Sequence, residues 1–152
     1  EGEQLNFKGI PSFSPEHFRY VNNADPMKSK QLFKGLDQLM DEGVAQLFTL
    51  GMNGRKIIGT VGALQYEVIQ YRLEHEYGAK CSYENINVHK ACWVQAEDPK
   101  NEEFKEFKRV KQRYLAKDKQ GQLVFLADSA FTIQMTQSKY PTVKLHFTSE
   151  YE

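Results

Sequence analysis

An ordered series of strand and helix signals in the first 96 residues most constrains the fold of this chain. The segment HFRYV, at His17–Val21, has the composition of a strand, and Asp25-Pro26 then supplies a helix N-cap and a first helical residue. Apolar residues follow at helical spacing as far as Gly43, which ends the predicted helix. Two strand-like segments, AQLFTLG and RKIIGTVG, flank Asn53-Gly54, a residue pair typical of hairpin turns.

A second helix and further strands complete the first part of the chain. The helix is expected at Ala63–Tyr77, where Gly78 ends it, and strands are expected in AKCSYENINV and KACWVQA. The order strand, helix, hairpin, helix, strand is the split β-α-β pattern of ferredoxin-like domains. We therefore predict an α+β fold in which residues 17–96 form a ferredoxin-like split β-α-β sandwich.

The remaining residues, 97–152, are predicted to form an α/β extension of the same single domain. Asp98-Pro99 is expected to cap a helix that runs to about Leu115, and the apolar segment Gln122–Asp128 predicts a covered strand. Residues 129–140 contain an alternation typical of a strand, but a cap at Asp128-Ser129 and a terminating Pro141 favour a helix. TVKLHFTS then predicts a closing strand. We find no internal repeat in the sequence.

The stretch GTVGALQYEVIQYRL, Gly59–Leu73, raises the question of a phosphate-binding loop. A P-loop needs the pattern GxxxxGK[ST], in which Lys reaches the phosphates and Ser or Thr holds magnesium. Here GRKIIGT has Thr60 where the lysine would stand, and the dinucleotide pattern GxGxxG is absent. We interpret Gly62 as permitting a tight turn and close packing of the next helix on the sheet. A large side chain at Gly62 is then expected to destabilise the fold.

Composition and charge exclude several classes of protein. Twenty basic and twenty acidic residues cancel, so any affinity for nucleic acid requires a local basic patch. No apolar run approaches the roughly 20 residues that span a bilayer, and the start of the sequence has no signal-peptide pattern. For Cys81 and Cys92 we expect two buried free thiols in a reducing cytoplasm, with a disulfide as the alternative.

The motifs of common catalytic and metal sites are missing from the sequence. The four histidines are scattered without the HExxH spacing, the two cysteines lack the CxxC spacing, and no GxSxG elbow is present. We therefore expect no catalytic, cofactor-binding or metal-binding residue in this chain. The segment Glu74–Glu76 is expected to be a solvated helix face, and Trp93, Tyr66 and Tyr71 are expected to anchor the core.

One segment, EEFKEFKRVKQRYL, suggests a binding surface. On a helix its apolar residues Phe104, Phe107, Val110 and Tyr114 fall on one side, and its basic residues fall on the other. A cationic helix face can bind RNA phosphates, although an ordinary solvated face has the same pattern. The candidate RNA- or ribosome-binding residues are Lys105, Lys108, Arg109 and Arg113.

Taken in order, several segments resemble the carboxy-terminal domain of bacterial peptide chain release factor three. These segments are FKGIPSFSPEHFRYV, DPMKSKQLFKGLDQLMDEGVAQLF, GTVGALQYEVIQYRLEHEYG, SYENINVHKACWV and SKYPTVKLHF. The resemblance implies a translational GTPase that releases class I release factors from the ribosome. It also implies that GTP and magnesium bind in an upstream GTPase domain, and that residues 1–16 connect an upstream β-barrel to a domain at residues 17–152.

The resemblance also implies partners. The carboxy-terminal domain of this family packs against the GTPase and barrel domains and contacts small-subunit RNA and protein, in the cytoplasm and away from membranes. Two alternatives stay open at this point. One is the equivalent domain of elongation factor G or of a ribosomal protection protein, because the Gly59–Leu73 stretch also resembles the third domain of elongation factor G. The other is a stand-alone small α/β enzyme, for which the sequence offers no cluster of titratable groups.

Overall fold

The computed structural model describes residues 13–149, which form a mixed α+β domain with four α-helices and eight strands. Most of the predicted connector, residues 1–12, lies outside the described residues. The last residue of the predicted connector of residues 1–16, Glu16, lies beside the sheet. Its backbone N–H donates to the Thr60 carbonyl oxygen at 2.8 Å.

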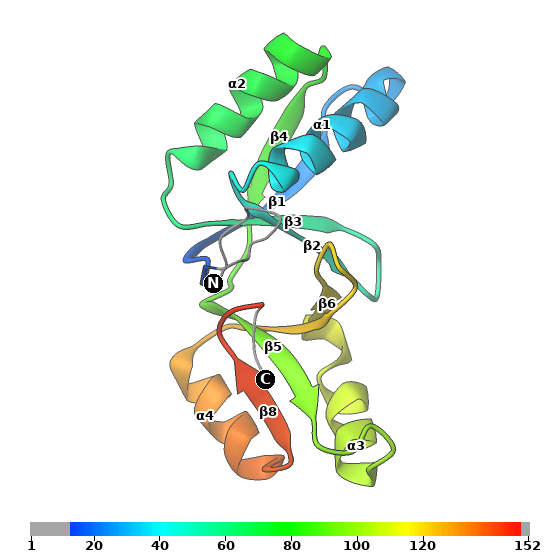
Figure 1. Ribbon diagram of the computed structural model, residues 1–152, viewed down its shortest axis with the longest axis vertical. Helices are drawn as coiled ribbons and strands as arrows, with labels where there is room; N and C mark the ends of the chain where they lie inside the picture. The colour runs from blue at the N-terminus through cyan, green and yellow to red at the C-terminus, as the bar shows by residue number, and fades with distance from the viewer. Residues whose placement is uncertain (1–12, 150–152) are drawn as a thin grey trace, which may run out of the picture.

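The elements follow one another in two series of the same kind, strand, helix, strand, strand, helix, strand (Figure 1). The first series is β1 (His17–Asn23), α1 (Ser29–Asp41) after the short 3-10 helix η2 (Pro26–Lys28), β2 (Gln46–Leu50), β3 (Lys56–Thr60), α2 (Gln65–Tyr77) and β4 (Cys81–Asn85). The second series is β5 (Lys90–Ala96), α3 (Glu102–Val110) with the 3-10 helix η3 (Gln112–Tyr114), β6 (Leu115–Lys117), β7 (Leu123–Ala127), α4 (Ala130–Lys139) and β8 (Val143–His146).

The strands form one sheet in the order β4-β1-β3-β2-β6-β7-β5-β8, and every pairing in it is antiparallel. From one edge inward the order is β4-β1-β3-β2, and from the other edge inward it is β8-β5-β7-β6. In each half these are the fourth, first, third and second strands of its series. The two halves therefore have the same topology, although their sequences show no repeat. Strand β5, which the sequence analysis grouped with the first part, pairs with β7 and β8 in the second half.

The two halves join through a short contact between β2 and β6, with Thr49 opposite Lys117 and Leu50 opposite Ala116. The sequence analysis missed β6 altogether, because three residues are too short to show a period. Its first residue, Leu115, was expected to be the last residue of a helix.

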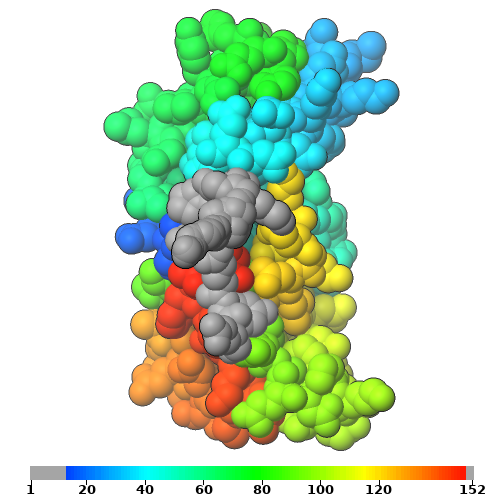
Figure 2. Space-filling model, in the orientation of Figure 1, coloured from blue at the N-terminus to red at the C-terminus, as the bar shows by residue number. Residues whose placement is uncertain are grey.

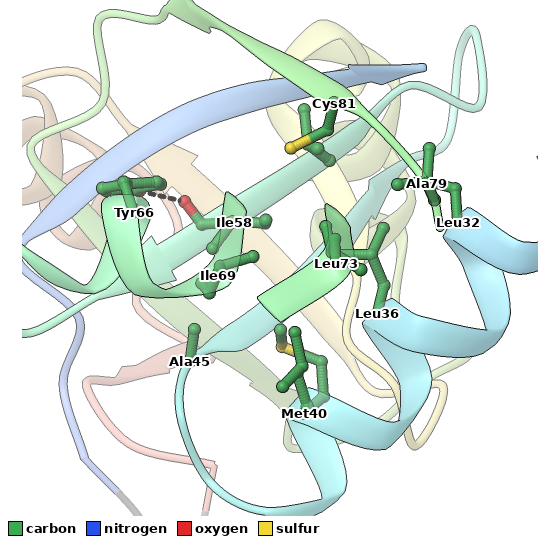
Figure 3. Close-up of a cluster of buried hydrophobic side chains, with 12 residues drawn as sticks. Leu32, Leu36, Met40, Ala45, Ile58, Tyr66, Ile69, Leu73, Ala79 and Cys81 are labelled. Atoms are coloured by element: carbon green, nitrogen blue, oxygen red, sulfur yellow. Dashed lines mark hydrogen bonds between the residues drawn. The ribbon is translucent and has the colours of Figure 1, made fainter. Parts of the chain in front are cut away.

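Three hydrophobic clusters divide the core into layers. One cluster lies between α1, α2 and the first half-sheet and includes Leu36, Ile58 and Leu73 (Figure 3). A second lies between α3, α4 and the other half-sheet and centres on Phe107 and Phe125. The third contains residues only from strands of both halves, so the two helix-free sheet faces pack against each other. The helices consequently lie at the two ends of the molecule, with the strands between them (Figure 1).

Two of the three predicted N-terminal caps are confirmed, although Asp25 caps the short helix η2 that leads into α1. The Asp25 carboxylate accepts a hydrogen bond from the Met27 backbone N–H at 3.1 Å, and the Ser129 hydroxyl accepts one from the Thr132 N–H at 3.0 Å. Gly43 and Gly78 follow α1 and α2 with φ of 80° and 63°, a conformation that glycine adopts without strain.

The interpretation of Gly62 is wrong in one respect. Gly62 lies between β3 and α2 as expected, but a Cβ there would meet only the end of the flexible Gln65 side chain, at 2.8 Å. The close approach of helix to helix occurs at Gly35 instead. A Cβ at Gly35 of α1 would lie 2.6 Å from Leu73 Cδ2 and 2.9 Å from the Tyr77 ring, both on α2.

Candidate functional site

The helix that carries the candidate basic residues is shorter than predicted. Asn101, rather than Asp98, caps α3, because its side chain accepts a hydrogen bond from the Glu103 N–H at 2.7 Å. The helix ends at Val110, and the chain turns through η3 into the extended backbone of β6. A helical projection therefore fails beyond Val110. Phe107 is buried as expected, but Val110 and Tyr114 are each 43% exposed and do not belong to a buried side.

The four candidate residues divide between α3 and η3. Lys105 of α3 is exposed and lies 3.3 Å from the Glu102 carboxylate, one turn earlier. The Lys108 ammonium lies 4.5 Å from the centroid of the Phe104 ring, so the lysine stem covers that ring. Arg109 is exposed at the end of α3, and Arg113 is exposed in η3.

Lys108 and Arg109 lie beside the turn between β2 and β3. Together with Gly51, Met52, Gln112 and Leu115 they line an open hollow of about 530 Å³. The Gly51 N–H donates to the Leu115 carbonyl oxygen at 3.1 Å, which ties the turn to the residue that follows η3. In Figure 2 the blue-green hairpin borders the yellow segment that contains η3 and β6. We call the surface formed by Lys108, Arg109, Gln112 and the turn residues Gly51 and Met52 the hairpin–α3 surface. We include in it Arg113, which does not line the hollow but follows Gln112 in η3.

Carboxylates do not neutralise the cations of the hairpin–α3 surface. Among residues 13–149, no Asp or Glu lies within ion-pair distance of Lys108, Arg109 or Arg113. The acidic residues of α3 are engaged elsewhere: Glu103 accepts a hydrogen bond from the Thr142 N–H at 2.7 Å, and Glu106 accepts one from the Tyr140 hydroxyl at 3.4 Å. The charges of α3 are thus segregated, and the hairpin side is cationic.

Arg72 of α2, unlike the cations of the hairpin–α3 surface, has two carboxylate partners. Its guanidinium donates to the Glu42 carboxylate at 2.6 Å and to the Glu76 carboxylate at 2.8 Å. These hydrogen bonds lower the pKa of both carboxyl groups below their ordinary value of 4.5. An anion would find no free charge at Arg72, whereas it would find three cations at the hairpin–α3 surface that no carboxylate of residues 13–149 compensates.

Helix α2 carries an exposed apolar stripe. Leu64, Val68 and Tyr71 follow one another at helical spacing, with Leu64 72% and Tyr71 64% exposed. The expectation that Tyr71 anchors the core is therefore wrong, while Trp93 and Tyr66 are buried as predicted. Glu67 and Glu74 lie on the same helix, are exposed, and form no ion pair within the described part of the chain. We call Val61, Leu64, Val68 and Tyr71 the α2 stripe.

Two buried side chains of the Gly59–Leu73 stretch, Thr60 and Tyr66, form hydrogen bonds with backbone carbonyl groups. The Thr60 hydroxyl donates to the Gly62 carbonyl oxygen at 2.8 Å, so this buried residue is satisfied locally. The Tyr66 hydroxyl lies 2.6 Å from the Ile58 carbonyl oxygen and 2.8 Å from that of His17 (Figure 3 shows the Ile58 bond). Burial raises the pKa of Tyr66 to about 12, which keeps its hydroxyl protonated as a donor.

Both cysteines are buried free thiols, as expected from the sequence. Burial raises the pKa of Cys81, and it raises the pKa of Cys92 to about 12. Among residues 13–149 no group of three or more His, Cys, Asp or Glu side chains could hold a metal ion. In the same residues, no helix combines the length and the apolar character that crossing a membrane requires.

Sequence reasoning found the cations but missed Gly51, Met52 and Gln112. The Asn53-Gly54 pair did predict the hairpin, and the structure confirms the turn, with Gly54 at φ 72°. What it could not show is that this turn packs beside the end of α3.

The chain matches the model of a known protein family over most of its length. The family model described as "Class II release factor RF3, C-terminal domain" matches residues 7–137 of this chain. That range includes the whole hairpin–α3 surface and the α2 stripe. The chain therefore belongs to the family of the C-terminal domain of the class II release factor RF3, a domain of a translation termination factor.

Proposed function

We propose that this chain is the non-catalytic ribosome-docking domain of a translation termination factor. The hairpin–α3 surface would contact small-subunit RNA. The full protein would be a GTPase that promotes release of class I release factors in the cytoplasm, with GTP and magnesium bound in an upstream domain. The observation that carries the RNA contact is the group of Lys108, Arg109 and Arg113, which have no carboxylate partner in residues 13–149.

The fold limits how RNA could be bound. Many RNA-binding domains of the βαββαβ type stack bases on the helix-free face of their sheet. In this chain the helix-free faces of both halves are buried against each other, with Phe48 and Trp93 at their contact. An RNA contact in the described part of the molecule must therefore use helices, hairpins or sheet edges, which agrees with the position of the hairpin–α3 surface.

Lys105 is the weakest of the four candidates. Its ammonium faces the Glu102 carboxylate, so a phosphate contact would have to displace that partner. We therefore assign the RNA contact mainly to Lys108, Arg109 and Arg113.

The same βαββαβ order supports a ferredoxin-like arrangement in residues 17–85. The strand order β4-β1-β3-β2, antiparallel throughout, with both helices on one face, is what that arrangement requires. We further propose that residues 1–16 connect an upstream barrel domain to a single domain at residues 17–152.

The α2 stripe supports the expected packing against other protein domains. The exposed apolar stripe that includes Leu64 and Tyr71 suits a protein surface. The carboxylates of Glu67 and Glu74 on the same helix, which form no ion pair within residues 13–149, would repel RNA. We propose that the GTPase or barrel domain of the same factor covers the α2 stripe.

The ribosome contact is tested by charge reversal in the release factor that carries this domain. Lys108→Glu, Arg109→Glu and Arg113→Glu together remove up to three phosphate contacts, and the slope of log K against log salt should fall by about 0.9 per lost duplex contact. The matched control reverses three exposed lysines elsewhere, Lys30, Lys34 and Lys80, with the same change in net charge.

Ribosome affinity measured by pelleting over a salt series should fall and lose salt dependence in the first variant only. GTP binding should be unchanged in both variants. Equal effects of the two variants would show that net charge, rather than this surface, governs docking.

A further inference from the structure

We propose that the hollow of the hairpin–α3 surface holds one unpaired nucleotide of RNA. This inference rests on the proposed function, and it adds the class of RNA that the surface selects. A nucleotide offers an anionic phosphate, a base edge with donors and acceptors, and an apolar base face. The lining of the hollow contains one kind of partner for each.

The phosphate partners are the two cations at the end of α3. Lys108 and Arg109 both line the hollow, and neither has a carboxylate partner in residues 13–149. Arg109 presents a planar guanidinium that can donate two parallel hydrogen bonds to one phosphate. Lys108, whose ammonium lies over the Phe104 ring, can add a compact charge.

The base partners are Gln112, Met52 and Leu115. Gln112 is exposed, and within the described residues its side-chain amide makes no hydrogen bond, so it is free to both donate and accept at a base edge. Met52 is 58% exposed at the turn, and Leu115, which also lines the hollow, is buried. Apolar side chains of this kind contact the face of a base that has left its stack.

The size and stiffness of the hollow suit this ligand. Its volume of about 530 Å³ lies in the range of roughly 300–1,000 Å³ typical of small-ligand sites. The turn that carries Met52 is held by the hydrogen bond from Gly51 to Leu115 and by a second one from the Gly54 N–H to the Leu50 carbonyl oxygen at 2.9 Å. The wall opposite α3 is thus fixed before RNA arrives.

A regular duplex would use only part of this lining. Its phosphates could reach Lys108 and Arg109, but its bases are stacked, so no base face can contact Met52. The surface should therefore bind duplex RNA weakly and prefer RNA with a single bulged nucleotide.

The test compares three two-stranded RNA duplexes without loops in fluorescence anisotropy with the 152-residue chain. One is fully paired, one has a single bulged nucleotide, and one has an abasic residue at the bulge, which keeps the phosphate and removes the base. We expect the bulged RNA to bind about tenfold tighter than the other two, since a good contact of a side-chain amide with a base edge is worth about that much.

Two groups of variants separate the two parts of the proposal. Met52→Ser combined with Gln112→Ala should abolish the preference for the bulge, so that the bulged and fully paired RNAs bind this variant equally. The control Met27→Ser changes a methionine that is also exposed but lies in η2, and it should retain the preference. Lys108→Glu with Arg109→Glu should weaken binding of all three RNAs. Thermal melting should show that every variant folds, because all the changed side chains are on the surface.

Each remaining outcome overturns a defined statement. Equal affinity for the bulged and abasic RNAs, with the charge reversals still weakening both, would overturn the nucleotide site and leave the proposed RNA contact standing. Binding of no RNA, or binding that the charge reversals do not change, would overturn the RNA contact and the nucleotide site together.

Discussion

Phe48 of β2 and Trp93 of β5 pack with ring centroids 5.7 Å apart and an interplanar angle of 58°, and neither side chain is exposed. The two residues belong to different halves of the chain, so this contact makes the helix-free faces of the two half-sheets into one core. The Trp93 indole N–H also donates to the Asp118 carboxylate at 2.9 Å, in the turn between β6 and β7.

Replacing Trp93 should therefore destabilise the whole domain. Trp93→Ala leaves a large cavity beside Phe48 and should lower the free energy of unfolding by about 3–5 kcal/mol. Phe131→Ala is the control, because that ring is 68% exposed and its loss should change stability by less than about 0.5 kcal/mol. Urea unfolding followed by far-UV circular dichroism measures both. Two separate transitions in the parent protein would show that the halves do not share a core.

The glycines of the first half give a second prediction. Gly35→Ala should lower the free energy of unfolding by about 1–2 kcal/mol, because the new methyl group would overlap Leu73 and Tyr77 across the α1–α2 contact. Gly62→Ala should be almost neutral, since Gln65 can move aside. Thermal melting of the two variants compares them directly, and a larger loss at Gly62 would contradict the positions of these helices.

The cysteines should be unreactive in the folded protein. Because burial raises the pKa of the Cys92 thiol from its ordinary 9 to about 12, the folded state favours the neutral form. The resulting contribution to stability is complete below about pH 9 and is lost as the pH rises towards 12. A colourimetric thiol reagent near pH 8 should detect no thiol in the native chain and both thiols after denaturation. Rapid reaction of one thiol in the native state would contradict its burial.

The Arg72 network should stabilise the fold only while its carboxylates are charged. Hydrogen bonds from Arg72 lower the pKa of Glu42 and Glu76, so their contribution is present above the unfolded value of about 4.5 and is lost as the pH falls through the lowered folded values. Arg72→Met should thus lower the melting temperature at neutral pH, and the difference from the parent should shrink below about pH 4. Lys34→Met, which removes an exposed cation of α1, should show no such convergence.

The elements of this fold were largely predictable from local signals, whereas their partners were not. The cap at Ser129 identified α4 in a segment whose alternation also suits a strand, because a cap satisfies backbone donors that only a helix leaves free. By contrast, the sequence KACWVQA does not indicate which strands pair with it. A strand that is covered on both faces has the same apolar sequence pattern whichever half of the sheet it joins. Its pairing with β7 and β8 depends on contacts with residues distant in the sequence.

In the candidate site too, the residue types were predictable from the sequence, whereas their spatial neighbours were not. The charges of Lys108, Arg109 and Arg113 are visible in the sequence, and so is the Asn53-Gly54 turn. That the turn lies beside the cations follows from the β2–β6 pairing, and β6 is too short to be predicted. The exposure of Val110 and Tyr114 was missed for a related reason, because the change from α3 to η3 breaks the helical period.

The central claim, that the hairpin–α3 surface faces small-subunit RNA, is tested most directly by tethered hydroxyl-radical probing. An iron chelate is attached to Gln112→Cys in the release factor that carries this domain, after accessible cysteines of its other domains are replaced; Cys81 and Cys92 are buried and should not be labelled. Lys30→Cys on α1 is the matched control. Our account predicts cleavage of small-subunit RNA from position 112 in the ribosome-bound factor and little from position 30. Cleavage from position 30 with none from position 112 would contradict it.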